Sequence, residues 1–430
     1  MSEIDNIFEK DKLNRKETIE NLTNLAKNTE EPFVLCIDAP WGGGKTFFVD
    51  LWQEYLNGQN AKSIKFNAWE NDFSKEPFIS LMGEITSQII ETDAVSEIKD
   101  KLIESGKKVI WNGLRIGVKA LTAGVLDLKE VRDCLPDGTL DSIGNDVSSL
   151  IETTIIEYAQ QKQTRDDFKN ILEKYAEKVK TETGFPLIFF IDELDRCRPD
   201  YAVELLESVK HLFYVKNIFF VLSVDYKQLS NSIKTLYGYK MDSERYLKRF
   251  INVLFHLSND NIKNYLSLFD TRDYLNTQYC KNFKLDFKEY IIALNLNPRD
   301  VQRLFEMLDL IYKVNTDKEI LCSAHMLLFL IGLKQSNLKM YGDIINNANK
   351  FYEKNKILTP VISKMGQNLK RYTSSLLYIL TSDNNTIYEY IETLEYSMRR
   401  YYEDLLHFHQ NVQLIQLIKV IEFASKFSSH

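Results

Sequence analysis

Glycine and proline are scarce in this sequence, which contains 16 and 8 of them among 430 residues. Leucine, lysine, glutamate, isoleucine and tyrosine are plentiful instead, so we predict a mostly helical protein with one buried sheet. Hydrophobic residues make up 44% of the chain, which excludes a disordered protein. No internal repeat and no low-complexity tract occurs. At this length we expect two or three domains.

Cysteine is also rare, because the chain has five and no two of them form a Cys-x-x-Cys pair. The odd number and the spacing argue against a disulfide framework and a zinc knuckle, and they agree with a reducing, cytoplasmic location. The segment Met1–Lys12 is polar and charged, so we expect no secretory signal.

Positive charge is not in excess, since 54 Lys and Arg stand against 61 Asp and Glu and the formal net charge is -7. This balance argues against a broad nucleic-acid-binding surface, which needs clustered Lys and Arg. The overall charge therefore gives no strong sign of a nucleic-acid partner, although a local basic groove is compatible with it.

Two apolar stretches have to be tested as membrane spans. The stretch Ile320–Leu333 has no charge but is too short to cross about 30 Å of hydrocarbon, and we predict a buried core helix there. The stretch Val109–Leu126 is longer, but Arg115 and Lys119 lie near its centre, where charges are costly in lipid. A soluble or surface-lying amphipathic helix is the favoured interpretation, and membrane spanning is not expected.

Apolar runs of strand length alternate with helical patterns in the first part of the chain. We expect strands at Phe33–Ile37, Ser63–Asn67, Leu187–Ile191, Ile218–Val224 and Ile251–Leu257. This alternation predicts a parallel, doubly wound α/β sheet, whose ligands bind at the carboxyl ends of the strands. We assign residues 1–258 to this domain, with a helical insertion at about 75–182. Residues 259–430 are expected to form a helical lid and a C-terminal helical region.

The strongest motif is Ala39-Pro-Trp-Gly-Gly-Gly-Lys-Thr46, which lies between a predicted strand and a predicted helix. Its glycines let backbone N–H groups turn toward a phosphate, and the start of the helix adds partial positive charge. Lys45 is expected to reach the β- and γ-phosphates, and the Thr46 hydroxyl to ligate Mg²⁺. Ala39 replaces the glycine that usually opens this motif, which is a mild change. The alternative is an ordinary glycine-rich turn. The predicted nucleotide contacts are Trp41, Gly42, Gly43, Gly44, Lys45, Thr46 and Phe47.

The second motif is Leu187-Ile-Phe-Phe-Ile-Asp-Glu193, an apolar strand that ends in two acids. Such a strand is typical of the Walker B motif of P-loop NTPases. We expect Asp192 to hold Mg²⁺ through water beside Thr46, and Glu193 to act as the general base toward the attacking water. The alternative is a strand followed by an acidic turn.

Two weaker signals follow these motifs. Asp225 closes the fourth predicted strand, where it would either sense the γ-phosphate or cap the next helix. Arg299 and Arg303 are spaced at i and i+4, and we expect Arg299 to contact the triphosphate from the lid. The alternative for both arginines is a solvated or salt-bridged helix face.

Arg196 and Arg198 directly follow the Walker B motif. Either could act across a subunit boundary as an arginine finger, although structural pairing with Asp195 or Asp200 is favoured. His407 and His409 are interpreted as part of a helix face rather than as a metal site. The sequence has no Asn-Lys-x-Asp segment for reading guanine, which favours ATP over GTP.

Four segments together resemble the KAP family of P-loop NTPases: Ala39–Thr46, Phe66-Asn-Ala-Trp69, Phe190–Pro199 and Tyr246-Leu-Lys-Arg249. The resemblance spans about Pro32 to Arg303 and implies an ASCE-type P-loop fold with a helical lid. Family members often carry membrane helices between the Walker motifs, but the candidate segment here is short and charged. Prokaryotic members are often linked with plasmids, phages and defence, so the resemblance makes antiviral defence an expectation.

We therefore predict a Mg²⁺-dependent ATPase that works as a switch or motor with a partner protein or by self-association. The alternatives are a nucleotide-gated assembly scaffold with little hydrolysis and a membrane-surface module that uses Val109–Leu126. Glu193 favours the enzyme, because a protein that only binds nucleotide has no need of a general base.

Overall fold

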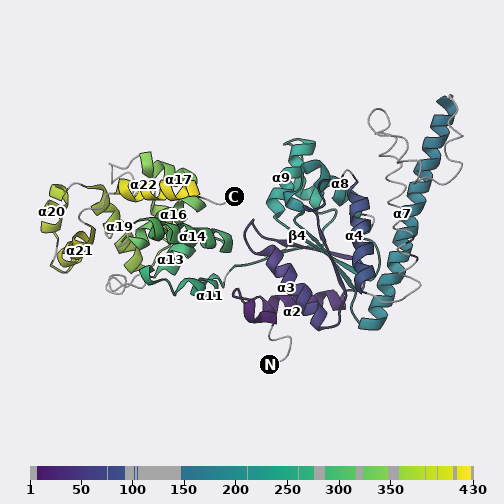
Figure 1. Cartoon of the computed structure of the whole chain (residues 1–430), viewed down its shortest axis with the longest axis horizontal. Helices are drawn as coiled ribbons and strands as arrows, with labels where there is room; N and C mark the ends of the chain where they lie inside the picture. Colours follow the sequence, from purple (N-terminus) through teal and green to yellow (C-terminus); the bar gives the residue numbers. More distant parts are fainter. Residues whose placement is uncertain are drawn as a thin grey trace. The chain divides into compact units, whose positions relative to one another are not determined.

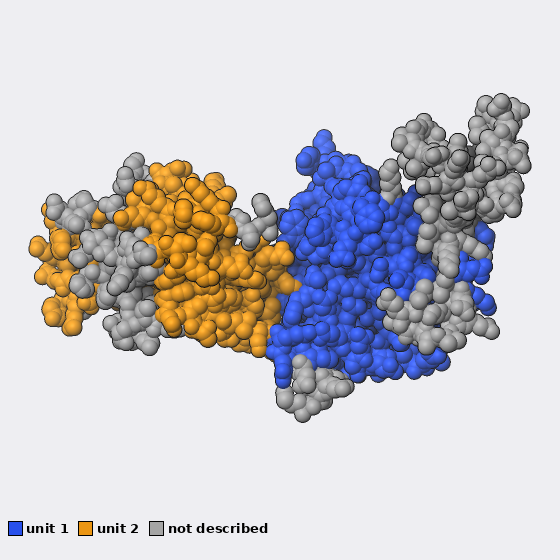
Figure 2. Space-filling view, in the orientation of Figure 1, with its two compact units in different colours: residues 1–11, 15–41, 45–257 blue, residues 12–14, 42–44, 258–430 orange. Residues whose placement is uncertain are grey.

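The computed structural model of the chain describes residues 7–74, 76–92, 101, 104, 147–210, 212–259, 261–275, 286–315, 323–346, 358–382, 384–394, 396–409 and 414–427. The chain divides into two compact units, which are coloured separately in Figure 2. The first, here called the sheet unit, contains residues 1–11, 15–41 and 45–257. The second, here called the helical unit, contains residues 12–14, 42–44 and 258–430.

The sheet unit is built on five parallel strands in the order β2-β3-β4-β1-β5. Their bounds are β1 Phe33–Asp38, β2 Ser63–Asn67, β3 Leu187–Asp192, β4 Ile218–Val224 and β5 Val253–His256. β4 lies between β1 and β3, so the strand of the Walker B motif does not neighbour the strand that precedes the glycine-rich loop. The parallel P-loop fold predicted from the sequence is confirmed.

Successive residues of the central strands face opposite sides of the sheet and enter two separate hydrophobic cores. Leu35, Phe190 and Val221 pack on the side covered by α2 (Lys16–Asn28) and α3 (Lys45–Gly58). Their strand neighbours pack on the other side, against α4 (Pro77–Thr92), α7 (Val147–Thr183), α8 (Pro199–Val209) and α9 (Tyr226–Tyr237). Figure 1 shows the resulting layers of helices on both faces of the sheet. Every residue of β3 and β4 is buried, which explains why both sequences are continuous apolar runs.

The shorter elements of the sheet unit are η1 (Phe8–Lys10), η2 (Leu194–Arg196) and α10 (Ser243–Leu247). β5 is the least regular of the expected strands. It is shorter than the predicted Ile251–Leu257, lies at the sheet edge and leaves most of its residues exposed. Its partly polar sequence agrees with this edge position.

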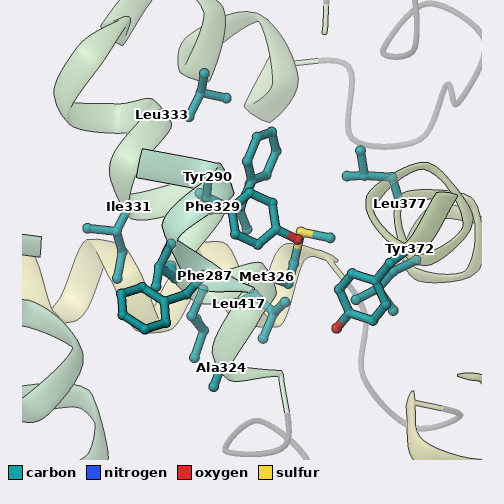
Figure 3. Close-up of a cluster of buried hydrophobic side chains, with 14 of the residues drawn as sticks. Phe287, Tyr290, Ala324, Met326, Phe329, Ile331, Leu333, Tyr372, Leu377 and Leu417 are labelled. Carbon is teal, nitrogen blue, oxygen red and sulfur yellow. The ribbon is translucent and has the colours of Figure 1, made fainter. Parts of the chain in front are cut away.

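The helical unit packs around α16 (Ala324–Ser336), in which every residue from Ala324 to Leu333 is buried. Figure 3 shows Met326 and Phe329 of this helix among Tyr290, Tyr372 and Leu377 from other helices. The buried core helix expected near residues 320–333 is thus confirmed, and it begins at Ala324. The remaining elements are α11 (Ile262–Leu266), η3 (Ser267–Phe269), η4 (Asp273–Leu275), α13 (Phe287–Ala293), α14 (Pro298–Val314), α17 (Leu338–Asn346), α19 (Gln367–Thr381), α20 (Asn384–Glu392), α21 (Tyr396–His409), α22 (Leu414–Ala424) and η5 (Ser425–Phe427).

Among the described residues, no helix combines the length and the apolar character needed to cross a membrane. The stretch Val109–Leu126, discussed above as a candidate, lies outside the described residues.

Two glycines of the helical unit provide a matched test of its core packing. A Cβ on Gly332 in α16 would lie 2.8 Å from Leu294 Cδ1 and 3.2 Å from Leu304 Cδ1, whereas a Cβ on Gly342 in α17 would meet nothing within 4 Å. We expect Gly342→Ala to raise the free energy of unfolding by about 0.5–1 kcal/mol, as Ala does in a helix. Gly332→Ala should lower it by about 1–3 kcal/mol through overpacking. Equal stabilisation of the two variants in denaturant titrations would contradict this description of the core.

Candidate functional site

The pairing of the central strands places three candidate segments at one edge of the sheet. Asp38 at the end of β1 pairs with Val224 of β4, and Asp192 at the end of β3 pairs with Ser223. Because all three strands are parallel, their carboxyl ends coincide. The chain turns from β1 into α3 at this edge, and the Asp192–Glu193 pair leaves β3 there. The structure therefore brings together the two motifs that lie about 150 residues apart in the sequence.

The glycine-rich loop has the backbone conformation that its sequence predicts. Gly42 has φ +84° and Gly44 has φ +81°, in the left-handed region that glycine adopts without strain. α3 begins at Lys45, whose ammonium group is buried and donates a hydrogen bond to the Ala39 carbonyl at 2.7 Å. The loop thus ends in the first turn of a helix, and the Lys45 ammonium group is hydrogen-bonded to the loop backbone. This arrangement is suited to binding a phosphate group.

Asp195 connects this loop to the segment after β3, a contact that the sequence analysis missed. Its Oδ2 accepts a hydrogen bond from Trp41 Nε1 at 2.5 Å and lies 3.8 Å from Lys45 Nζ. Asp195 is buried beside Lys45, so its negative charge compensates the positive charge of the lysine where little water can do so. The sequence offered a signal, since Asp195 follows Walker B by two residues, but it was considered only as a partner for nearby arginines.

Asp192 is fully buried at the carboxyl end of β3. Its Oδ1 accepts a hydrogen bond from the Glu193 N–H at 3.0 Å, whereas its Oδ2 lies 3.9 Å from Lys65 Nζ. Within the described part of the chain, Oδ2 has no hydrogen-bond partner. Burial raises the pKa of this carboxyl group above its ordinary value. A buried carboxylate oxygen without a partner fits the role of binding a water of a hydrated Mg²⁺ ion.

Glu193 has an unusual backbone and a fully engaged side chain. Its φ of 62° lies in the left-handed region, which is costly for a residue other than glycine and often marks a functional site. Oε1 forms an ion pair with Arg196 at 2.6 Å and accepts a hydrogen bond from Thr46 Oγ1 at 3.5 Å. Oε2 accepts a hydrogen bond from Asn67 Nδ2 at 3.3 Å. The expected base therefore lies beside Thr46, with both oxygens already in use.

Asn67 was missed as a site residue, although its segment carried the family resemblance. It ends β2 and pairs with Asp192 in the strand register. Its Oδ1 accepts hydrogen bonds from the Trp69 and Glu70 N–H groups, which fixes the amide that reaches Glu193. Only the register between β2 and β3 brings these residues together, so no local pattern could have shown the contact.

Asp225 caps α9 by accepting a hydrogen bond from the Gln228 N–H at 3.1 Å, as the structural alternative expected. Ser223, two residues earlier, is the β4 residue that pairs with Asp192. It is fully buried and is the single polar side chain of β4. Ser223 is therefore closer in register to the Asp192–Glu193 pair than the predicted sensor, Asp225.

The two arginines after Walker B have different partners within the sheet unit. Arg198 binds Asp72 through its Nε and its backbone N–H, at 2.6 and 2.8 Å, and lies 3.6 Å from Asp200. Asp72 was not among the expected partners. Arg196 instead pairs with Glu193, and its guanidinium lies 5.8 Å from the centre of the Trp69 ring.

Arg299 belongs to the helical unit, at the start of α14. Asn297 and Asp300 close this helix with a reciprocal capping box, and burial raises the pKa of Asp300. Within the same unit, the Arg299 N–H donates to the Gly42 carbonyl at 3.4 Å. A Cβ on Gly42 would lie only 2.7 Å from Arg299 Cβ, so this position requires glycine for space as well as for its φ.

Two comparisons with known proteins place the chain among related sequences. The sequence model of the KAP family P-loop domain matches residues 15–315, which include the glycine-rich loop, the Asp192–Glu193 pair and Arg299. An uncharacterized protein of Methanocaldococcus jannaschii is 28% identical over 164 residues, which cover 35% of this chain and 83% of that protein.

Because the Asp192 carboxylate is buried, we predict that its charge lowers the stability of the folded protein. The folded-state pKa of Asp192 is raised, so its ionised form costs stability above that pKa, and the cost disappears as the pH falls through it. Asp192→Asn removes the charge and keeps an Oδ1 that accepts from Glu193. We expect the variant to melt about 2–4 °C higher at neutral pH, for a gain of about 1 kcal/mol, and to lose this advantage in acid. A lower Tm at neutral pH would contradict the argument.

Proposed function

Because this chain belongs to the KAP family of P-loop NTPases, we propose that it binds ATP with Mg²⁺ and hydrolyses it at the carboxyl ends of β1 and β3. The observation that carries the proposal is the convergence of Lys45, Thr46 and the Asp192–Glu193 pair at one sheet edge. A nucleotide-binding protein without hydrolysis would need the first two residues but not a buried glutamate beside them.

The glycine-rich loop and Lys45 would bind the phosphates. Among the described residues, the partners of the Lys45 ammonium group are one backbone carbonyl and one buried carboxylate, so a triphosphate offers it a stronger counter-charge. The other residues proposed to contact the nucleotide are Trp41, Gly42, Gly43, Gly44 and Phe47. The side chains of Trp41 and Phe47 are exposed. Thr46 and Asp192 would hold Mg²⁺, which neutralises phosphate charge when bound.

We propose that Glu193 orients the attacking water and accepts its proton, and that Arg196 restrains it. Glu193 Oε1 accepts from both Arg196, at 2.6 Å, and Thr46, at 3.5 Å, so both of its lone pairs are in use and a water would have to displace one of these partners. Breaking a charge-assisted hydrogen bond of this kind costs about 1.5–3 kcal/mol. The ion pair therefore acts as a brake on hydrolysis, and Asn67 keeps Glu193 aligned by binding its other oxygen.

Charge that develops on the γ-phosphate requires a further cation, and we propose Arg299 for this role. Arginine suits phosphate because its planar fork can donate two parallel hydrogen bonds. The proposal is supported by the family match, which extends through α14. Arg303 is the second candidate, one helical turn further along.

We propose that hydrolysis drives a switch or motor that acts with a partner protein or through self-association in the cytoplasm. A role in antiviral defence is also proposed, and it rests on the family resemblance. The alternative is a nucleotide-gated scaffold that assembles without turnover, and Glu193 is the residue that argues against it.

Two variants test binding and chemistry separately. Lys45→Ala should abolish nucleotide binding, because the phosphates lose their main counter-charge. Glu193→Gln should bind ATP normally but release phosphate about 10²–10⁴-fold more slowly, as expected for loss of a general base. Nucleotide affinity by titration calorimetry and phosphate release would be measured for both. If Glu193→Gln turns over ATP as fast as the wild type, Glu193 has no part in the mechanism. If the wild type assembles on binding nucleotide but shows no turnover, the scaffold is favoured instead.

Three arginine variants separate a brake, a lid cation and a structural residue. Arg196→Ala should raise kcat by about tenfold, because Glu193 no longer has to leave a charge-assisted hydrogen bond. Arg299→Ala should lower kcat by about 10–100-fold, less than the loss of a finger supplied in trans. Arg198→Ala, which removes an ion pair with Asp72 away from Glu193, is the control and should leave kcat unchanged. If Arg196→Ala loses activity only at concentrations at which the protein assembles, Arg196 is a trans finger instead.

A further inference from the structure

The acidic chain contains one strongly basic segment. Between Lys210 and Arg249 there are eight Lys and Arg against three Asp and Glu, in a chain with a formal net charge of -7. This segment begins directly after α8 and contains β4, α9 and α10. Six of its cations are exposed or half-buried on or beside α9 and α10, with the exposed Asp242 and Glu244 among them, and we call these six together the basic face: Lys210, Lys234, Lys240, Arg245, Lys248 and Arg249.

Side-chain contacts hold the three helices of this face together. Tyr246 of α10 donates a hydrogen bond to Glu207 of α8 at 2.6 Å, and its ring lies 5.7 Å from that of Tyr237 at the end of α9. The hydroxyls of Ser230 and Ser243 bridge α9 and α10 at 2.5 Å. Figure 1 shows α8 and α9 adjacent in the sheet unit. Lys210 and Lys234 each lie one helical turn from these contacts, and Arg245, Lys248 and Arg249 flank Tyr246.

The cations of the basic face outnumber the acids around them and form no close ion pairs within the described residues. Within the described residues, none of the six forms an ion pair, whereas other surface cations such as Lys65, Arg198 and Lys334 do. Aromatic rings accompany them: Tyr237 is 52% exposed and Tyr239 is 90% exposed. An unpaired positive surface costs electrostatic repulsion, which a polyanionic ligand would relieve.

We propose that the basic face binds single-stranded nucleic acid. Unpaired lysines and arginines suit the phosphates, and the exposed faces of Tyr237 and Tyr239 suit stacking on unpaired bases. An anionic membrane fits less well, because the apolar side of α9 already packs inside the sheet unit, where Leu229 and Ile233 are buried. A membrane-bound helix would have to offer that side to lipid. This binding is separate from the nucleotide site, so it holds whether or not the chain hydrolyses ATP.

Anisotropy of a labelled mixed-sequence oligonucleotide of about 20 nucleotides tests the proposal on the full chain. The double variant Lys240→Glu/Arg245→Glu should weaken binding at least about tenfold and reduce the salt slope by about 1.4, the value for two lost phosphate contacts. Tyr239→Ala should weaken binding about tenfold without changing the salt slope, because stacking releases no counterions. The control Lys174→Glu/Lys180→Glu reverses two charges of α7 and should bind like the wild type.

Three results would overturn the proposal. The first is no binding by the wild type while ATP still binds. The second is equal weakening by the two double variants, which would indicate a general effect of net charge. The third is binding to vesicles containing anionic lipid, lost in Lys240→Glu/Arg245→Glu, without binding to the oligonucleotide; a membrane is then the ligand. ATP affinity, measured for each variant, shows that the fold is intact and separates failure here from failure of the nucleotide site.

Discussion

Parallel pairing of β3 with β4 and of β4 with β1 is the constraint on which the candidate site depends. This pairing brings the ends of strands far apart in the sequence to one edge, where Asp192 meets Ser223 and the glycine-rich loop leaves β1. A slip of one residue in β3 would turn Asp192 toward the opposite face of the sheet. The complete burial of β3 and β4 prevents that slip, because each residue already fills one of two hydrophobic cores. Packing therefore sets the position of the acidic groups.

The acidic groups at this edge are buried, and each lies near a buried or half-buried cation. Lys45 lies near Asp195, Arg196 binds Glu193, and Lys65 faces Asp192 at longer range. Such pairs contribute little net stability, since desolvation offsets most of the attraction. The site is thus maintained at some cost to the fold, and the strained backbone of Glu193 adds to that cost. An anionic ligand with its cation would rearrange these pairs rather than enter a neutral cavity.

Most of the sheet could be predicted because its strands are continuous apolar runs that are bounded by polar residues. The predicted Ser63–Asn67 and Ile218–Val224 agree with the observed strands, and Leu187–Ile191 lacks only Asp192. The edge strand β5 was predicted too long, since a half-exposed strand has a weaker pattern. Contacts that depend on register or on a turn could not be predicted: Asn67 with Glu193, Trp41 with Asp195, and Arg198 with Asp72. Local sequence reports burial and periodicity, whereas these pairs arise from tertiary packing.

The hydrogen bond between the Trp41 indole and the Asp195 carboxylate gives the protein a built-in optical probe. Trp41 is 46% exposed, and its indole N–H donates to a carboxylate that also lies near Lys45. Indole emission depends on the polarity and charge around the ring. Trp52, in contrast, is buried in the core beside α2, where its N–H donates to Thr23. The chain has two further tryptophans, Trp69 beside Arg196 and Trp111 outside the described residues. In a variant with both replaced by phenylalanine, the emission of Trp41 would report movement of Lys45 or Asp195 over the background of the buried Trp52.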